Sequence, residues 1–348
     1  MLVIGLSFLV SFAAAVVGGS IFSMLSLPLP WMLGPLTAAL LLKEYVKPGP
    51  AVPDMVKQAG LGILGITFGM TFTADTFSQA APILPPYLLL TCFTIAFGAC
   101  FGWLISRRTG IQKQAAIYGA VPGGLSEMVI AAETVRADPS IVIVSQTIRL
   151  VMVLFLVPAA MTMIFASGSS GTETMFSAPA VEASYVSSGT VWLAAAIAGG
   201  WVLRKAVPAG MVLVPLLFVI ALQLSGTALP PVPETMFLAA QAAVGVSLGI
   251  SISFTDIAYA GKRSTYFFTM ALSLILFSAA MGVLLMFWTG MDIATALLST
   301  APGGLVEMVL TAGAVGADAA VVTSLQLFRI LLILLLVPPI FKRLLAKE

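Results

Sequence analysis

Long apolar runs, separated by short polar segments, recur from one end of the chain to the other. Runs such as Ile83–Ile105, Ile141–Phe165 and Tyr266–Trp288 have roughly the 20 residues that an α-helix needs to cross the hydrocarbon core of a bilayer. In the first half, the pattern predicts long helices at about 2–27, 30–46, 54–75, 83–106 and 139–165. We therefore predict an all-α polytopic membrane protein whose main contact is the lipid bilayer.

Composition supports this fold class. Of the 348 residues, 60% are hydrophobic and 9% are charged, and the mean hydropathy is +1.10. A soluble core cannot bury so much apolar surface. The first run lacks a basic leading region, so we interpret it as a retained helix and not as a signal peptide. The net charge of +2 is mild and no DNA-binding motif is recognisable, which argues against a nucleic-acid partner.

The chain contains no histidine and two cysteines, Cys92 and Cys100, which lie in one apolar run. Imidazole is the commonest protein ligand for copper, zinc and iron, so a catalytic site for these metals is not expected. The cysteines are better interpreted as small apolar residues that pack within a helix. The sequence predicts no metal and no cofactor.

Two thirteen-residue segments are near copies of each other: AVPGGLSEMVIAA begins at residue 120, and TAPGGLVEMVLTA begins at residue 300. We interpret the chain as a tandem duplication, with repeats at 1–166 and 190–348 and a Ser/Gly/Thr-rich linker at 167–189. The same offset of 180 positions relates many other residues, including Pro28 and Pro208, Pro35 and Pro215, Pro53 and Pro233, Gly65 and Gly245, Gly69 and Gly249, Gly102 and Gly282, Asp138 and Asp318, and Pro158 and Pro338.

Basic residues indicate how the repeats are oriented. If each Pro-Gly-Gly segment dips into the membrane and returns, each repeat crosses an odd number of times, and fourteen basic residues fall on one face. If the segment crosses, the split becomes nine to five. Because Lys and Arg are retained on the cytoplasmic side, the first model is favoured. It predicts two inverted repeats in a bacterial inner membrane, with cytoplasmic termini and an extracytoplasmic linker.

The Pro-Gly-Gly segment is therefore predicted to be the tip of a re-entrant helical hairpin. Proline cannot continue the incoming helix, and glycines permit the turn. The helix before the tip rises roughly 12 Å, which brings the tip close to the midplane of the bilayer. Irregular backbone at that depth needs protein or a wet cavity around it. We expect the two tips to approach one site from opposite sides; their residues are Pro122, Gly123, Gly124, Pro302, Gly303 and Gly304.

Glu127 and Glu307 lie in the first turn of the helix that follows each tip. The free N–H groups of such a helix start can bind an anion. Alternatively, the glutamates themselves neutralise the helix dipole there. A third interpretation makes one of these glutamates a proton carrier. The sequence leaves these alternatives open.

Arg149 and Arg329 lie about 15 Å into the last helix of each repeat, again near the midplane. Gln146 and Gln326 precede them by one turn on the same helix face. An arginine at that depth is costly unless it is paired or wet, and the two glutamates are the candidate partners. Arg–Glu pairs could lock the fold, or the arginines could bind a solute; both interpretations stay open.

The repeated segments GITFGMTFT and GVSLGISIS place Thr67 above Thr71 and Ser247 above Ser251 on one helix face. These hydroxyls could line a cavity, or they could bond their own backbone. The glycines between them permit close helix packing.

The duplicated PGGLxEM motif, with its downstream Gln and Arg, resembles the AbrB-type membrane protein family, whose members are described as ammonia monooxygenases or as regulators of gene expression. The resemblance covers essentially the whole chain. The predicted layout also looks like that of citrate-type carriers and, more loosely, of bile-acid symporters. The regulatory description implies an indirect role, and the absence of histidine does not support the monooxygenase description.

These patterns favour a secondary transporter for a small anionic or zwitterionic solute or ion, which is not an enzyme. Protons on Glu127 or Glu307, or sodium on the tip carbonyls, are the alternatives for coupling. A membrane sensor that affects gene expression indirectly is the second hypothesis, and an enzyme is the third. A homo-oligomer is compatible with the sequence.

Overall fold

The computed structural model consists of helices and their connections over the residues that it describes, which are 2–47, 49–165, 186–207, 209–227, 229–253, 261 and 263–345. The side chains of 2–6, 74, 125–127, 186–188, 263, 342 and 344–345, and most of the predicted linker, lie outside the description. Six of the described helices are long and apolar enough to span a bilayer, and shorter apolar helices accompany them. With the composition, these helices make the chain a polytopic membrane protein.

The chain divides into two compact units, and each unit takes helices from both halves of the sequence. The first unit contains α1 (Leu2–Met24), α2 (Pro30–Tyr45), α3 (Asp54–Met70), α8 (Val186–Leu203), α9 (Gly210–Leu224) and α10 (Glu234–Ser251). The second contains most of α4 (Ala74–Thr109), α7 (Pro139–Phe165), α14 (Leu305–Val315) and α15 (Ala319–Leu345), together with α5 (Lys113–Ala120), α6 (Leu125–Glu133), α12 (Arg263–Thr289) and α13 (Ile293–Thr300). The compact units thus differ from the predicted sequence repeats, whose inverted relation stays a prediction.

In the first unit, the predicted glycine motifs lie where helices cross closely. Gly65 on α3 lies against the carbonyl group of Val212 on α9, and Gly245 on α10 lies against the carbonyl group of Met32 on α2. Gly245 is the counterpart of Gly65, and Met32 is the counterpart of Val212, at an offset of 180 positions. The same contact is therefore made twice, with the glycine in the first half in one case and in the second half in the other. Such reciprocity is typical of two-fold related bodies. The small residues let the helix backbones approach each other.

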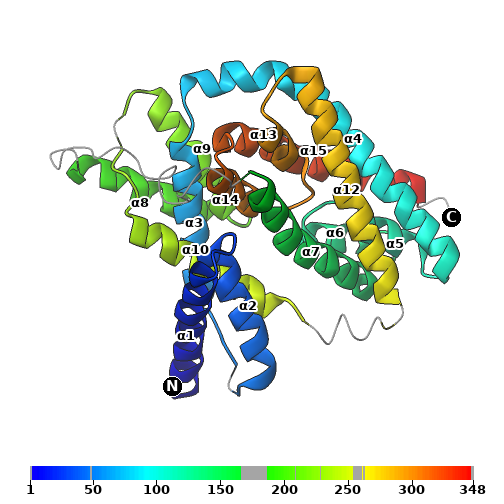
Figure 1. The fold of residues 1–348 in the computed structure, drawn as a ribbon, viewed down its shortest axis with the longest axis horizontal. Coiled ribbons are helices and arrows are strands. Elements are labelled where there is room, and N and C mark those ends of the chain that lie inside the picture. Colours follow the sequence, from blue (N-terminus) through cyan, green and yellow to red (C-terminus); the bar gives the residue numbers. More distant parts are fainter. Residues whose placement is uncertain are drawn as a thin grey trace. The chain divides into compact units, whose positions relative to one another are not determined.

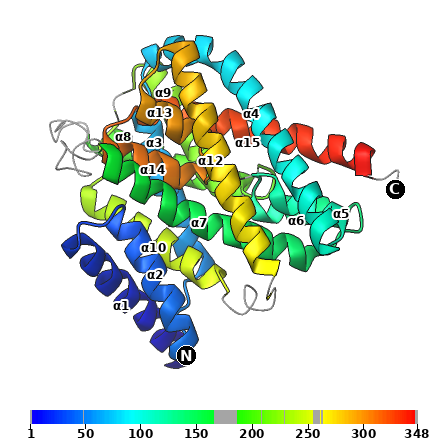
Figure 2. The ribbon, with the colours of Figure 1, turned by 45° about the vertical axis from the view of Figure 1, so that its right-hand side comes forward.

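Helices α1 and α2 pack side by side at the start of the chain, as both ribbon views show (Figure 1 and Figure 2). Gly18 on α1 and Gly34 on α2 make this close contact through their backbones. A small apolar cluster of Ala14, Ala39 and Val246 joins this pair to α10. The core of the first unit is therefore built from small side chains at helix crossings.

In the second unit, α4 and α12 lie next to each other, in cyan and gold in Figure 1. Phe97 and Phe277, which are 180 positions apart, stack face to face with ring centroids 4.1 Å apart and planes 1° apart. Both helices end at a glycine with positive φ, Gly110 at 69° and Gly290 at 73°. Glycine adopts this backbone conformation without steric cost, which is why it commonly terminates helices.

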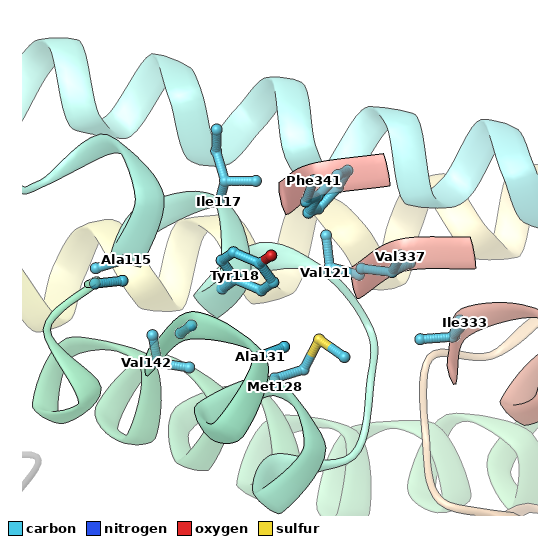
Figure 3. Packing of buried hydrophobic residues seen from close by; sticks show 12 residues of the cluster. Ala115, Ile117, Tyr118, Val121, Met128, Ala131, Val142, Ile333, Val337 and Phe341 are labelled. Carbon is cyan, nitrogen blue, oxygen red and sulfur yellow. The ribbon is translucent and has the colours of Figure 1, made fainter. Parts of the chain in front are cut away.

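The first broken helix packs against the last helix of the chain. Figure 3 shows Tyr118 on α5 and Met128 on α6 in one apolar cluster with Val337 and Phe341 of α15. The rings of Tyr118 and Phe341 meet edge to face, with centroids 5.6 Å apart. The cluster joins a segment of the first half to a segment of the second, and so fixes the position of the first helix break within the unit.

Candidate functional site

Both predicted helix breaks are present in the second unit. Helix α5 ends at Ala120 and α6 begins at Leu125. Between them, the Gly123 N–H donates to the Val121 carbonyl at 2.8 Å, which closes a three-residue turn around Pro122. Proline suits this turn because it has no N–H to leave unsatisfied. The second break is built in the same way, since the Gly303 N–H donates to the Ala301 carbonyl at 2.9 Å.

The two ends of the α5–α6 segment lie together. The side-chain amide of Gln112, just before α5, donates to the carbonyl of Arg136, just after α6, at 3.0 Å. The same amide group accepts from the backbone N–H of Asp138 at 2.8 Å. The chain therefore returns after Pro122 to a point next to where α5 begins.

Arg149 and Gln146 on α7 satisfy the carbonyl groups at the first break. The two terminal nitrogens of Arg149 donate to the carbonyls of Val121 and Gly123, at 2.8 and 2.9 Å. Gln146 donates to the carbonyls of Tyr118 and Val121, at 2.9 and 3.0 Å. The last carbonyls of a helix have no partner within the helix, and they carry the negative end of its dipole. A cation that donates two hydrogen bonds satisfies both needs.

The same clamp recurs at the second break. Arg329 on α15 donates to the carbonyls of Ala301 and Gly303. Gln326 donates to the carbonyl of Leu298 at 2.7 Å and more weakly to the next carbonyls along the chain. All acceptors except Ser299 lie 180 positions from a counterpart at the first break, so the two halves hold their helix breaks by closely similar arrangements.

One carbonyl at each break is satisfied by a different donor in the two halves. The Gly119 carbonyl accepts from the hydroxyl of Ser145 at 3.0 Å. Its counterpart, the Ser299 carbonyl, accepts from the hydroxyl of Tyr87 on α4 at 3.1 Å. The residue that matches Ser145 is Leu325, which has no donor. The Ser299 carbonyl thus accepts from Gln326 on α15 at 3.2 Å and, from another helix, from the Tyr87 hydroxyl.

Both arginines donate to backbone carbonyls, and the candidate pairing with a glutamate can be examined only for Glu307. Glu307 is 6% exposed in the first turn of α14, and its carboxylate fills the space beside Gly304. It attracts Arg329 electrostatically, but the described side chains include no ion pair between the two. The side chain of Glu127 lies outside the described residues. In the second half, the two terminal nitrogens of the arginine are therefore satisfied by the helix break itself.

Both prolines line one small cavity in the second unit. Its volume is about 10 Å³, which is room for about one water molecule. Its lining consists of Thr91, Thr94, Pro122, Thr300, Pro302 and Arg329. The two helix breaks, which are 180 residues apart in the sequence, therefore border the same space.

Several buried polar atoms of the clamps have no partner among the described residues: Nε of Arg149 and Arg329, and Oε1 of Gln146 and Gln326. All four side chains are at least nine-tenths buried. Unsatisfied buried donors and acceptors are rare in folded proteins and call for a ligand, a water molecule or a functional reason. The clamps therefore retain unused hydrogen-bonding capacity.

The predicted hydroxyl stripes belong to the first unit. Thr67 lies on α3 and Thr71 directly follows it. Their hydroxyls donate to carbonyls of this helix, at 2.9 and 2.8 Å. Ser251 does the same on α10, at 2.7 Å, while Ser247 is half-buried. Of the two interpretations open at these positions, bonding to the local backbone describes the three hydroxyls whose partners are known. A role in lining a cavity stays a prediction.

The lining threonines and Tyr87 were not predicted from the sequence, because single hydroxyls inside an apolar run are common in membrane helices. A signal was nevertheless present, since Tyr87, Thr91 and Thr94 correspond to Phe267, Ala271 and Leu274 in the second half. Such a difference between otherwise matching halves marks a local polar requirement. Among the described residues, no group of three potential metal-ligating side chains occurs.

Comparison with known proteins agrees with the resemblance seen in the motif. The chain is 25% identical over 353 residues to "Uncharacterized protein YhjN" of Bacillus subtilis, covering 95% of this chain and 91% of that protein. It is 27% identical over 327 residues to "Putative regulator AbrB" of Escherichia coli, covering 92% of this chain and 91% of that protein. The family model described as "Transition state regulatory protein AbrB" matches residues 31–345. Since that match covers most of the chain, the protein belongs to the AbrB family of membrane proteins.

Proposed function

We propose that this protein is a secondary transporter for a small anionic or zwitterionic solute, and that it lies in the bacterial inner membrane with both termini in the cytoplasm. The observation that carries the proposal is a cavity bordered by both helix breaks and by Arg329. In transporters, substrate sites are commonly built where discontinuous helices from two repeats meet near the bilayer midplane. The proposal includes no enzymatic step and no cofactor.

The hairpin geometry supports an inverted arrangement of the two halves. Helices α5 and α6 have 8 and 9 residues, so each rises only about 12–14 Å, less than half of the bilayer core. Gln112 bonds to the chain on the far side of α6, which fits a segment that enters and leaves on one face. With re-entrant hairpins, the basic residues collect on the cytoplasmic side, as expected for short loops.

The division into two compact units also supports transport. In inverted-repeat transporters, alternating access comes largely from rigid-body motion of one bundle relative to the other. Each unit here combines helices from both halves, so each could move as a whole. The cavity at the helix breaks holds about one water molecule, so a larger solute requires an opening that this conformation does not provide.

Coupling remains part of the proposal, with two alternatives. Glu307 is buried beside Arg329 and could carry a proton. Sodium would need carbonyl ligands at the breaks, but those of Val121, Gly123, Ala301 and Gly303 already accept hydrogen bonds from the arginines. A sodium ion on these carbonyls would lie close to a guanidinium group of the same charge, and this repulsion favours the proton.

The proposal is tested by a ligand screen followed by flux measurements. The purified protein is screened against small anionic and zwitterionic metabolites, in sodium and in potassium buffers, because a ligand of the native state raises the melting temperature. Compounds that stabilise the protein are then offered to proteoliposomes under a proton or a sodium gradient. We expect gradient-driven uptake of at least one of them. Binding without uptake under either gradient would reject the transport proposal.

A membrane sensor is the second candidate, and the names of the matching relative and family favour it. The relative from Escherichia coli carries the word regulator, and the family model describes a regulatory protein. A sensor would bind its ligand at the helix breaks without moving it, and it would pass the signal to a partner that acts on transcription. Flux separates the two candidates, because only a transporter accumulates the bound compound.

A further inference from the structure

We infer that the two arginine clamps have different tasks: Arg149 only holds its helix break, whereas Arg329 also binds the anionic group of the transported solute through its free Nε–H. This inference rests on the proposed transport function and names the residue and the ligand chemistry of its site. It comes from a comparison of matching positions in the two halves.

The two arginines are equivalent in their backbone contacts. Each donates through both terminal nitrogens to the residue before and the residue after the proline of its break. Arg149 is 8% exposed and Arg329 is 6% exposed, and neither Nε has a partner among the described residues. If both arginines were purely structural, the same substitution at either position should therefore have the same effect.

Their surroundings differ. Arg329 lines the cavity between the breaks, and the lining does not include Arg149. The cavity also has three threonines, Thr91 and Thr94 on α4 and Thr300 at the end of α13. Their counterparts in the other half are apolar, Ala271, Leu274 and Ala120, and all three are buried. Among the described residues, the threonines that line the cavity thus have apolar residues at the matching positions of the duplicated arrangement.

The hydrogen bonds of the second break reinforce this difference. Tyr87 holds the Ser299 carbonyl and lies one turn before Thr91 on α4. The matching residue in the other half, Phe267, belongs to an apolar cluster with Ala116, Ala120 and Ile148. Residues 87, 91 and 94 follow helical spacing, so they share one face of α4. This face of α4 contacts the second break through Tyr87 and lines the cavity through Thr91 and Thr94.

The lining has the chemistry of an anion site. The described lining residues include one arginine and three threonine hydroxyls, and none of these described residues is acidic. The hydroxyls of Thr91, Thr94 and Thr300 donate to carbonyls in their own helices, but such bonds are readily exchanged because a hydroxyl can rotate. A carboxylate oxygen could accept a charge-assisted hydrogen bond from Nε of Arg329 and further ones from the hydroxyls.

The test compares Arg329→Lys with its matched control, Arg149→Lys, in the full-length protein. Lysine keeps the charge but cannot reproduce the planar set of donors. The probe is formate, the smallest carboxylate, added as its sodium and potassium salts against chloride at equal ionic strength. Formate affinity is measured from the rise in melting temperature and by titration calorimetry. We expect both variants to melt at similarly lowered temperatures, and formate affinity to fall at least tenfold in Arg329→Lys only.

A second pair of variants keeps the test decisive if Arg329→Lys does not fold. Thr300→Ala reproduces the residue of the other half and should weaken formate binding, whereas Ala120→Thr, the reciprocal change, should not alter it. Equal losses of affinity in both arginine variants, or unchanged binding in Thr300→Ala, would overturn the inference. So would a wild-type protein that does not bind formate.

The inference and the transport proposal can fail separately. Gradient-driven uptake of a neutral or cationic solute, without formate binding, would leave transport standing and reject the anion site. Formate binding that depends on Arg329, without flux of any compound, would leave the anion site standing and reject transport. An effect seen only with the sodium salt would assign the stabilisation to the cation and reject the inference.

Discussion

At the scale of single residues, the most informative side chains are those that satisfy the carbonyl groups of a broken helix. A helix break within a membrane leaves acceptors that lipid cannot satisfy. Arg149 supplies two donors and Gln146 supplies two more hydrogen bonds, all to the segment from Tyr118 to Gly123. The arginine, which would be costly in lipid, is stabilised by the backbone groups that would otherwise be costly themselves.

The exchange of donors between the halves yields a rescue experiment. Ser145→Ala removes the donor to Gly119 and should lower the free energy of unfolding by about 1 kcal/mol. In that background, Phe267→Tyr should restore at least half of the loss, because the matching Tyr87 already makes this bond at the second break. The effect is measured from the melting temperatures of the wild type, Ser145→Ala, Phe267→Tyr and the double variant. Failure of Phe267→Tyr to raise the melting temperature of Ser145→Ala would contradict the equivalence of the two halves.

Sequence reasoning found the clamp residues but not what they contact. Arg149, Arg329 and their glutamines stand out because polar side chains are rare inside apolar runs. Their acceptors, however, are backbone carbonyls, which every residue possesses and no pattern displays. Only the position of the helix end decides which carbonyls are free. The three-dimensional arrangement was needed to show that Arg329 donates to the carbonyls of its own helix break.

At the scale of elements, apolar runs predicted most helices closely. The span expected at 30–46 is α2 at Pro30–Tyr45, and the span expected at 139–165 is α7 with the same bounds. The span expected from residue 83 begins earlier, since α4 starts at Ala74 and includes Pro82, Pro85 and Pro86. Prolines usually mark a helix boundary, but membrane helices tolerate them where neighbouring groups satisfy the freed carbonyls.

Helix crossings in the first unit predict which glycines are irreplaceable. In Gly65→Ala, the new Cβ would collide with the Val212 backbone, which cannot turn aside, so we expect a loss of about 1–3 kcal/mol. Gly199→Ala is the control, because its Cβ would meet only Val214 at 3.6 Å, an ordinary contact. The control should be neutral or gain up to about 1 kcal/mol from helix propensity. Melting temperatures in one detergent compare them, and equal losses would contradict this account of the packing.

At the scale of the whole molecule, each compact unit is made of corresponding helices from the two halves. The 180-residue offset predicted that matching contacts would exist, such as Gly65 with Val212 and Gly245 with Met32. It could not predict which helices belong to which unit. A constant offset shows which residues are equivalent in the two halves, but it does not show which helices pack together. The orientation of the halves in the bilayer was inferred from charge and is open to direct measurement.

Accessibility of single cysteines tests that orientation. Lys113→Cys and Arg136→Cys flank the α5–α6 segment, and they are made in a Cys92→Ala, Cys100→Ala background because both native cysteines are exposed. If the segment is re-entrant, both engineered cysteines react with an impermeant reagent in inside-out vesicles and neither reacts in intact cells. Reaction of the two positions from opposite sides would show that the segment crosses the membrane and would remove the support for inverted halves.

Because each unit takes helices from both halves of the sequence, its folding depends on the order of synthesis. The ribosome adds about 5–20 residues per second, so the first half waits in the membrane for roughly 10–40 seconds before α8–α10 and α12–α15 are complete. During that wait, neither unit can finish folding. The first clamp, however, lies wholly between Tyr118 and Arg149, so its arginine finds all of its observed acceptors within the newly inserted half. The second break accepts a hydrogen bond from Tyr87, which lies on α4 in the first half. This donor has therefore already been synthesised when the second break is made.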